Sequence, residues 1–92
     1  MTQVKLSGHI IVPQQQLALI KEALVEHTQL TLAEVGCIKF EVKQCELDNC
    51  KFYVDELFTD ESAFNYHQQR VQNSAWGAVT KDVQRFYKVK KI

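Results

Sequence analysis

Residues that interrupt or cross-link a chain are scarce in this sequence, which has one proline, three glycines and three cysteines among 92 residues. An odd number of cysteines argues against a disulfide framework, and Cys45 and Cys50 lack the C-x-x-C spacing of a zinc or redox site. We expect reduced, structural thiols, with a reversible Cys45–Cys50 bridge across a hairpin as the alternative. The length suffices for one small domain over residues 1–92.

Net charge and long apolar runs are absent too. Eleven Lys and Arg balance eleven Asp and Glu, and the one basic cluster, residues 88–91, is explained by a solvated chain end. We therefore expect no nucleic-acid partner. No apolar stretch approaches the roughly 20 residues of a membrane span, and the amino terminus lacks the basic region and apolar core of a signal peptide. These absences predict a cytoplasmic protein with no membrane partner.

The motifs that hold common cofactors are also missing. The sequence has no glycine-rich phosphate loop, no G-x-G-x-x-G, no H-E-x-x-H and no nucleophile elbow. Nothing in it supplies a nicotinamide, flavin or ATP site. We expect no cofactor and no bound metal, so that any chemistry would rest on side chains and on the substrate itself.

What the sequence does contain is a regular succession of apolar patterns. Alternation with a period of two predicts four strands, over residues 4–12, 37–44, 51–58 and 82–89. Helical spacing predicts helices over residues 14–32 and from the cap at 59–62 to about 73, and Ser74 caps a short helix to Val79. We expect Gly36 to end the first helix in the left-handed conformation. The order is that of the ferredoxin-like βαββαβ unit, an α+β fold.

The two faces of the predicted sheet differ in what should cover them. The helices cover one face, and in the second strand Ile38 and Phe40 belong to it. The opposite face also holds apolar side chains, namely Ile11, Cys37, Tyr53, Leu57 and Phe86. This is more apolar surface than open solvent favours, and two such sheets packed together would bury it. Alternation alone therefore predicts a homodimer, with His9 on the dimer face or at an edge.

Glu56 is the most informative polar side chain, because its strand parity places it inward with Phe52, Val54 and Phe58. An unpaired carboxylate there would be costly, so it is either paired or protonated. One interpretation is a proton acceptor, or an anchor that holds a nearby histidine in one tautomer. The other is a slip in parity at a bulge, or a carboxylate that reaches the rim of a helix.

His67 and Trp76 belong to the last helical part of the chain. His67 lies one turn from Phe64, on the side expected to face the sheet, where it is either an acid/base or a satisfied histidine bonded to Glu56 or to a carbonyl. Trp76, beside Gly77, either forms a wall for a flat aromatic substrate or fills the core.

Two arginines are candidates for holding an acidic or enolate oxygen, Arg70 and Arg85. Arg85 shares its strand parity with Val83 and Tyr87, which points it toward the helices. Either arginine would equally suit a bridge between subunits.

Several of these residues occur together in short motifs. Residues 31–42 read TLAEVGCIKFEV, residues 63–70 read AFNYHQQR and residues 74–77 read SAWG, with Glu56 between them. This arrangement resembles the antibiotic biosynthesis monooxygenase family, small dimeric α+β barrels that oxidise quinol-type aromatics without a bound cofactor. The match is good from residue 30 to residue 77 and the ends fit the same plan, so the resemblance covers most of the chain.

The resemblance implies roles for individual side chains. His67 would border the pocket as the acid/base, with Glu56 as its partner, whereas Glu34 would be structural and bond backbone near Gly36. A histidine precedes the Leu-Thr-x-Ala-Glu-x-Gly-Cys motif in the most similar subgroup, which implies that His27 borders the same pocket. The residues expected to contact substrate are Trp76, Phe40, Phe52, Phe64, His27 and Arg70. Relatives that degrade haem carry an asparagine on the first strand and a histidine after the tryptophan; both are missing here, which disfavours haem cleavage.

The first hypothesis for function is a cofactor-independent monooxygenase that oxidises a small quinol or polyphenol with molecular oxygen. The protein would deprotonate the quinol, stabilise the developing oxyanion and exclude water. The alternatives are an isomerase or lyase acting on a small oxygenated metabolite, a non-catalytic ligand-binding dimer of the stress-response kind, and a bare dimeric scaffold with a filled core.

Overall fold

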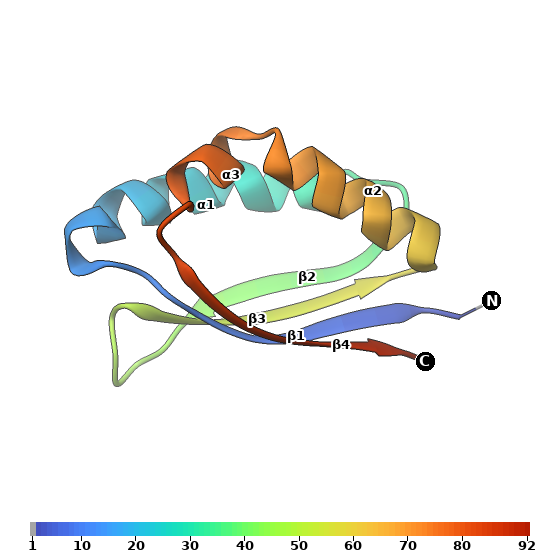
Figure 1. Ribbon diagram of the computed structural model, residues 1–92, viewed down its shortest axis with the longest axis horizontal. Coiled ribbons are helices and arrows are strands. Elements are labelled where there is room, and N and C mark those ends of the chain that lie inside the picture. Colours follow the sequence, from blue (N-terminus) through green and yellow to red (C-terminus); the bar gives the residue numbers. More distant parts are fainter. Residues whose placement is uncertain (1) are drawn as a thin grey trace.

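In residues 2–92, which the computed structural model describes, four antiparallel strands form one sheet and three α-helices cover one of its faces (Figure 1). Met1, the first residue of the expected domain, lies outside the described residues. The strands are β1 (Val4–Ile11), β2 (Cys37–Gln44), β3 (Lys51–Phe58) and β4 (Gln84–Lys91). The helices are α1 (Leu17–Leu32), α2 (Glu61–Gln72) and α3 (Ala75–Val79), and a 3₁₀ turn over Gln14–Gln16 leads into α1.

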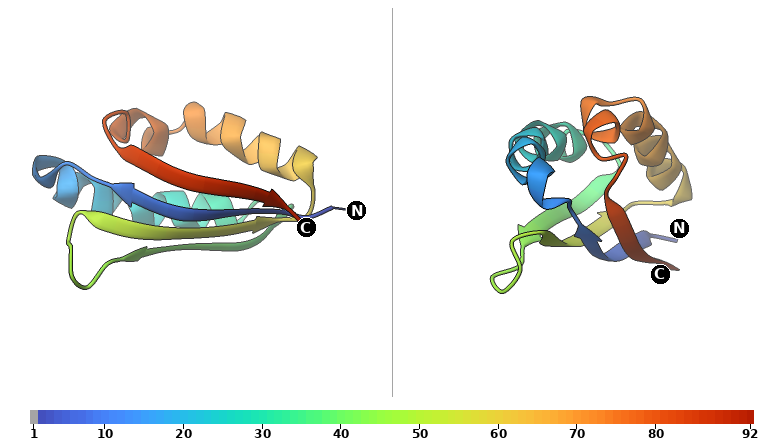
Figure 2. Two further views of the ribbon diagram at one scale, coloured as in Figure 1. Left: turned by 60° about the horizontal axis from the view of Figure 1, so that its bottom comes forward. Right: turned by 60° about the vertical axis from the view of Figure 1, so that its left-hand side comes forward.

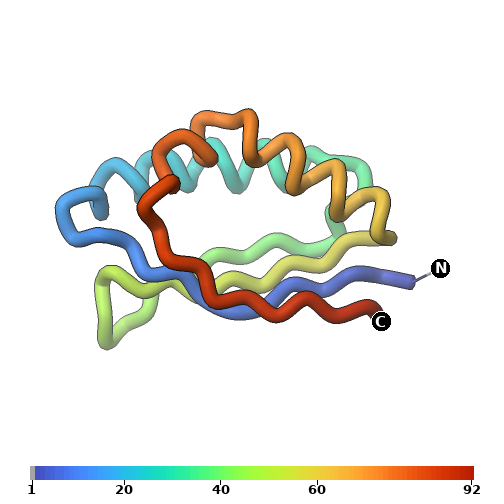
Figure 3. The backbone as a smooth tube through the Cα atoms, viewed as in Figure 1, coloured from blue at the N-terminus to red at the C-terminus, as the bar shows by residue number. Residues whose placement is uncertain are grey.

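The sheet has the order β2-β3-β1-β4, so the first strand lies between the third and the last. Leu6 of β1 pairs with Glu56 of β3 on one side and with Val89 of β4 on the other. The chain ends meet at one edge of the molecule, where Gln3 and Ile92 exchange backbone hydrogen bonds of 3.0 and 2.8 Å (Figure 3). This is the ferredoxin-like α+β fold expected from the order of the elements.

The helix starts follow the local capping residues that the sequence predicts. The Asp60 side chain accepts a hydrogen bond from the Ala63 amide at 2.8 Å and begins α2, and the Ser74 hydroxyl accepts one from the Gly77 amide at 3.2 Å and begins α3. Within residues 2–92, no helix has both the length and the apolar character needed to cross a membrane.

The core lies between the helices and the inner face of the sheet. The β1 side chains with inward parity, together with Val12 just after the strand, are each at most 2% exposed: Val4, Leu6, Ile10 and Val12. Leu6, Ile10 and Val12 pack with Phe52 and Val54 of β3 and with Ile20 of α1. Strand β4 begins at Gln84 instead of residue 82 as expected, so Val83 lies in the loop before the strand, where it is still buried. Burial of this apolar face is what holds the helices on the sheet.

A β-bulge in β2 changes which side chains of this strand point inward. The pairing with β3 shifts between Cys37 and Lys39, so that Cys37 lies opposite the fully buried Phe58. The expected placement of Cys37 on the outer face is therefore wrong. Ile38, expected inward, is 47% exposed, whereas Phe40 returns to the inner face opposite Glu56.

Glycine is required at two positions by close approach of neighbouring chain segments. Gly8 has φ +152°, and a Cβ there would lie 1.9 Å from the Phe86 carbonyl oxygen of β4. Gly36 does not have the positive φ expected of a left-handed helix end, since Gly8 is the glycine with positive φ in the described chain. A Cβ at Gly36 would instead lie 2.3 Å from the Cβ of Ala63, so this glycine lets α2 approach the end of α1.

The outer face of the sheet carries no helix of the described chain, and the left view of Figure 2 brings it forward. Across its middle, Tyr53 and Phe86 flank His9 on neighbouring strands, as the alternation predicts. Tyr53 is 48% and Phe86 50% exposed, and the His9 ring stacks on Phe86 with centroids 4.8 Å apart. An exposed apolar row of this kind is typical of a surface that another protein covers.

The three cysteines are free thiols. The Tyr53 hydroxyl donates to Cys45 Sγ at 3.7 Å, and Cys50 Sγ donates to Gln14 Oε1 at 3.1 Å.

Candidate active site

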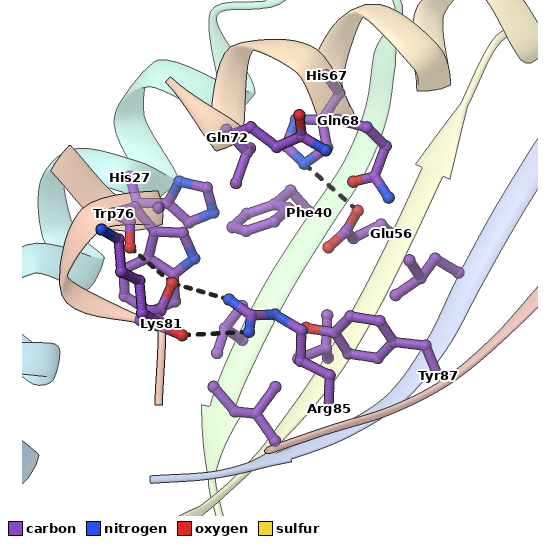
Figure 4. Close-up of a pocket in the computed structure, with 17 residues that line it drawn as sticks. His27, Phe40, Glu56, His67, Gln68, Gln72, Trp76, Lys81, Arg85 and Tyr87 are labelled. Carbon is purple, nitrogen blue, oxygen red and sulfur yellow. Dashed lines mark hydrogen bonds and ion pairs between the residues drawn. The ribbon is translucent and has the colours of Figure 1, made fainter. Parts of the chain in front are cut away.

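A cavity of about 540 Å³ lies between the inner face of the sheet and the three helices (Figure 4). Its size is within the range of small-molecule sites. The walls combine aromatic and aliphatic side chains with a few polar groups from every helix and from two strands. The lining residues used below are His27, Phe40, Glu56, His67, Trp76, Arg85 and Tyr87. A cavity beside Glu56 argues against the bare scaffold with a filled core.

His67 reaches the cavity from α2 with both ring nitrogens facing carboxyl groups. Its Nδ1 lies 2.8 Å from Glu34 Oε2, and its Nε2 lies 3.6 Å from Glu56 Oε1. The ring is 2% exposed. Burial lowers the pKa of His67, and the bond to Glu34 opposes this shift. Because a carboxylate accepts and does not donate, the neutral ring carries its proton on Nδ1 and turns the Nε2 lone pair toward Glu56 and the cavity.

Glu34 is held in place by a second donor. Arg70 Nε donates to the same Oε2 at 2.8 Å, and Arg70 Nη2 donates to the buried Thr31 hydroxyl at 3.0 Å. The expectation that Glu34 bonds backbone near Gly36 is wrong, since its side chain links the turn after α1 to His67 and Arg70 of α2. The sequence holds one signal of this link, because His67 and Arg70 are three residues apart on one helix and face the same way.

Glu56 stands inward as its parity predicts and is 6% exposed. Burial raises the pKa of its carboxyl to about 7, and the charges of Glu34 and Asp55 add to the shift. The 3.6 Å separation from His67 is longer than a hydrogen bond, and Glu56 Oε1 has no hydrogen-bond partner in the described chain. Glu56 and His67 therefore form two neighbouring groups that can hold a proton at one side of the cavity.

His27 forms part of the wall by stacking on Trp76, with ring centroids 4.6 Å apart and an interplanar angle of 4°. Phe40 meets the His27 ring edge-on at 5.2 Å. Burial, followed by the charges of His67 and Arg70, lowers the pKa of His27 to about 3, so the ring is neutral. Its Nδ1 is buried and has no hydrogen-bond partner in the described chain. Trp76 and His27 thus form a flat aromatic part of the cavity wall.

Three of the residues expected to contact substrate do not line this cavity. Phe52 is 2% exposed in the core, and Phe64 packs against Phe58 with ring centroids 5.7 Å apart. Arg70 lies behind His67 and borders a smaller cavity of about 230 Å³ between the helices. The structure brings together His67, Glu56, Phe40, His27 and Trp76 from the expected set.

Further polar wall comes from Gln68 and Gln72 of α2, which the sequence analysis did not identify, and from β4 with the loop before it, of which the sequence identified only Arg85 through its parity. Arg85 Nη1 donates to the carbonyls of Thr80 and Val83, both at 3.2 Å, and Nη2 donates to the Thr80 hydroxyl at 2.8 Å. Burial raises the pKa of Tyr87 to about 12, although the Arg85 guanidinium beside it has the opposite effect. In the described part of the chain, no three His, Cys, Asp or Glu side chains form a group that could hold a metal ion.

These features define a small α+β protein in which a buried histidine lies between two carboxyl groups at an aromatic cavity. The model of the family described as antibiotic biosynthesis monooxygenase matches residues 6–79, and the chain belongs to this family. No curated protein matches the chain in sequence.

Solved structures share the fold across almost the whole chain. A Bacteroides thetaiotaomicron protein provisionally assigned as an antibiotic biosynthesis monooxygenase has a TM-score of 0.80 at 18% identity, covering 99% of this chain and 87% of that one. A conserved protein of unknown function from the same organism, described as a possible oxidoreductase, has a TM-score of 0.78 at 18% identity, with 99% and 96% covered. A Pseudomonas aeruginosa protein has a TM-score of 0.75 at 20% identity, with 100% and 93% covered. At these identities the likeness concerns the fold.

Proposed function

We propose that this protein is a cofactor-independent monooxygenase that oxidises a small quinol or polyphenol with molecular oxygen. The observation that carries the proposal is the position of His67, held by Glu34 at one nitrogen and open to the cavity and Glu56 at the other. Membership of the monooxygenase family supports the class of reaction. The stacked His27–Trp76 pair supports an aromatic substrate, because it offers a flat surface of the right kind.

In the proposed reaction, His67 Nε2 takes the first proton, and Glu34 stabilises the imidazolium that forms. The substrate anion then passes an electron to oxygen, and the two radicals combine into a C–O bond, so that a peroxide forms and regains the proton from His67. Neutral His67 then takes the second hydrogen of the same carbon as a proton, the O–O bond breaks with its electron pair on the outer oxygen, and a carbonyl remains. The hydroxide leaves as water with a proton from Glu56 or His67. One oxygen atom enters the product, the other enters water, and the substrate supplies all four electrons.

The test is oxygen consumption by the purified protein with a panel of quinols and polyphenols, under isotopically heavy oxygen gas. We expect uptake above the rate of autoxidation without protein, and one heavy oxygen atom in the product by mass spectrometry. Uptake with no heavy atom in the product would contradict a monooxygenase and indicate a simple oxidase. No uptake with any member of the panel would favour the second candidate.

The second candidate is an isomerase or lyase acting on a small oxygenated metabolite. Two proton sites 3.6 Å apart, with the pKa of Glu56 raised to about 7, suit the removal of a proton from one carbon and its return to another. Exchange of substrate hydrogen for deuterium from the solvent, without oxygen uptake, is the result that would assign this function.

We also propose that two chains pair through the outer face of the sheet. Tyr53 and Phe86 are about half exposed there, and the stacked His9 extends the row. We expect light scattering to give twice the mass of one chain, and Phe86→Asp to shift it to one chain because burial of a charge in this interface is costly. Lys21→Asp on the exposed side of α1 is the control and should leave the mass unchanged. A wild-type protein with the mass of one chain would contradict the pairing.

A further inference from the structure

The charges that line the cavity are not balanced. Two cations contribute to the wall, Lys81 from the loop after α3 and Arg85 from β4. In residues 2–92, neither of them forms an ion pair, whereas Arg70 is paired with Glu34 and Lys39 with Asp55. An uncompensated pair of positive charges at the edge of a cavity attracts anions.

Glu56 does not provide the missing negative charge. It is the one carboxyl among the lining residues, and it lies beside His67. Its pKa of about 7 means that it holds its proton for much of the time near neutral pH. In addition, the charged groups that act on it are Glu34 and Asp55, neither of which is a cation. The cavity therefore has a proton-transfer side at His67 and Glu56 and a cationic side at Arg85 and Lys81.

The cationic side of the cavity is preorganised, because hydrogen bonds hold the Arg85 side chain in one orientation. Its guanidinium donates three hydrogen bonds to the carbonyl and hydroxyl oxygens of residues 80 and 83. These are neutral acceptors, so they fix the group without neutralising it, and a guanidinium has further N–H groups to offer. Figure 4 shows the side chain reaching from β4 toward the loop that carries Lys81, on the other side of the cavity from His67.

We propose that Arg85 and Lys81 bind a carboxylate or phosphate group of the substrate, so that the rest of the molecule lies across the cavity and presents its acidic hydrogen to His67. This inference rests on the proposed function for the chemistry at His67, and it narrows the substrate class to small anionic aromatics. Charge-assisted hydrogen bonds to a planar guanidinium fix the orientation of an anionic group as well as its affinity. The anionic group would bind away from the reacting carbon, and its binding energy would hold that carbon in position next to His67.

Binding of unreactive probes tests this proposal separately from catalysis. Phenylacetate, phenyl phosphate and neutral benzyl alcohol are titrated into the wild-type protein by calorimetry, with quenching of Trp76, the one tryptophan in the sequence, as a second signal. We expect both anions, or one of them, to bind about 10-fold or more tightly than the alcohol, which corresponds to about 1.4 kcal/mol. Tighter binding of phenyl phosphate than of phenylacetate would identify a phosphate, and the reverse a carboxylate.

Variants then locate the anion. Arg85→Gln and Lys81→Gln should each weaken binding of the anion by about 10-fold and leave the alcohol unchanged. Arg85→Lys should retain part of the preference for the anions over benzyl alcohol, because lysine keeps the positive charge. Within residues 2–92 the Lys81 side chain forms neither a hydrogen bond nor an ion pair, so Lys81→Gln removes the charge without releasing the loop. Lys21→Gln, which removes a positive charge from the exposed side of α1, is the matched control. Equal affinity for the three probes, or an anion preference that survives in both variants, would overturn the proposal whether or not oxygen is consumed.

Discussion

His67→Ala should lower the rate of substrate oxidation by about 10²-fold to 10⁴-fold, the usual contribution of a general acid/base. The histidine ring is the group that faces both Glu34 and Glu56, at 2.8 and 3.6 Å, so no neighbouring side chain takes over both contacts. The loss should appear in kcat more than in KM, because the ring takes part in proton transfer in the transition state, whereas the aromatic wall still binds the substrate. Initial rates of oxygen uptake, measured with the best quinol of the panel, give this comparison.

The matched control is His9→Gln, a histidine substitution on the opposite face of the sheet. It should leave the rate within about 2-fold of wild type, and circular dichroism should verify that both variants are folded. Full activity in His67→Ala would move the acid/base role to another residue. Glu34→Gln should have an intermediate effect on the rate, because it keeps His67 but removes the carboxylate that raises the pKa of His67. We expect a smaller loss of rate and an acid limb of the pH profile displaced to lower pH.

Glu56→Gln should stabilise the protein at alkaline pH relative to wild type. The folded state raises the pKa of Glu56 from 4.5 to about 7, so in this interval the folded protein binds more protons than the unfolded chain. The contribution of Glu56 is then fully present below pH 4.5 and is lost as the pH rises through 7. At about 1.4 kcal/mol per unit of pKa, the loss is about 3 kcal/mol. Because glutamine cannot ionise, the free energy of unfolding of Glu56→Gln should not show this decrease with rising pH.

Urea unfolding at a series of pH values, followed by Trp76 fluorescence, measures this difference. The stability of Glu56→Gln minus that of wild type should increase by about 3 kcal/mol between pH 4.5 and pH 8. His27 has its pKa lowered from 6.5 to about 3 and so destabilises both proteins as the pH falls through this range, which cancels in the subtraction. Glu46→Gln, an exposed carboxyl in the hairpin, should run parallel to wild type. If the stability of Glu56→Gln also ran parallel to that of wild type over this pH range, burial would not raise the pKa of Glu56.

The parts of the fold that could be predicted are those governed by neighbours in sequence. Alternation in β1 predicted which side chains form the core, because successive strand residues point to opposite faces. The same rule placed Glu56 inward, although the sequence left a bulge open as an alternative. The polar cap at residues 59–62 and Ser74 predicted the starts of α2 and α3, and in the structure Asp60 and Ser74 each bond the amide three residues ahead.

The errors occurred where a residue's position depends on a partner far away in the chain. Cys37 changed face because the bulge in β2 is set by the pairing with β3. Gly36 is explained by contact with Ala63 across the helices rather than by its own backbone angles. Phe52 and Phe64 were correctly predicted to be apolar inward residues, but parity does not tell which part of the inner face is filled and which part is left open.

The sequence by itself thus determined the order of elements, the two faces of the sheet, the caps and the inward position of Glu56, since these follow from steric rules that act over a few residues. Only the tertiary structure decided the chemistry of the site. Glu34 and His67 are 33 residues apart, and they meet because α2 lies against the end of α1. Arg85 and Lys81 face the same cavity because β4 pairs with β1. Side-chain contacts of this range depend on how the elements pack, and packing is a property of the whole buried interior.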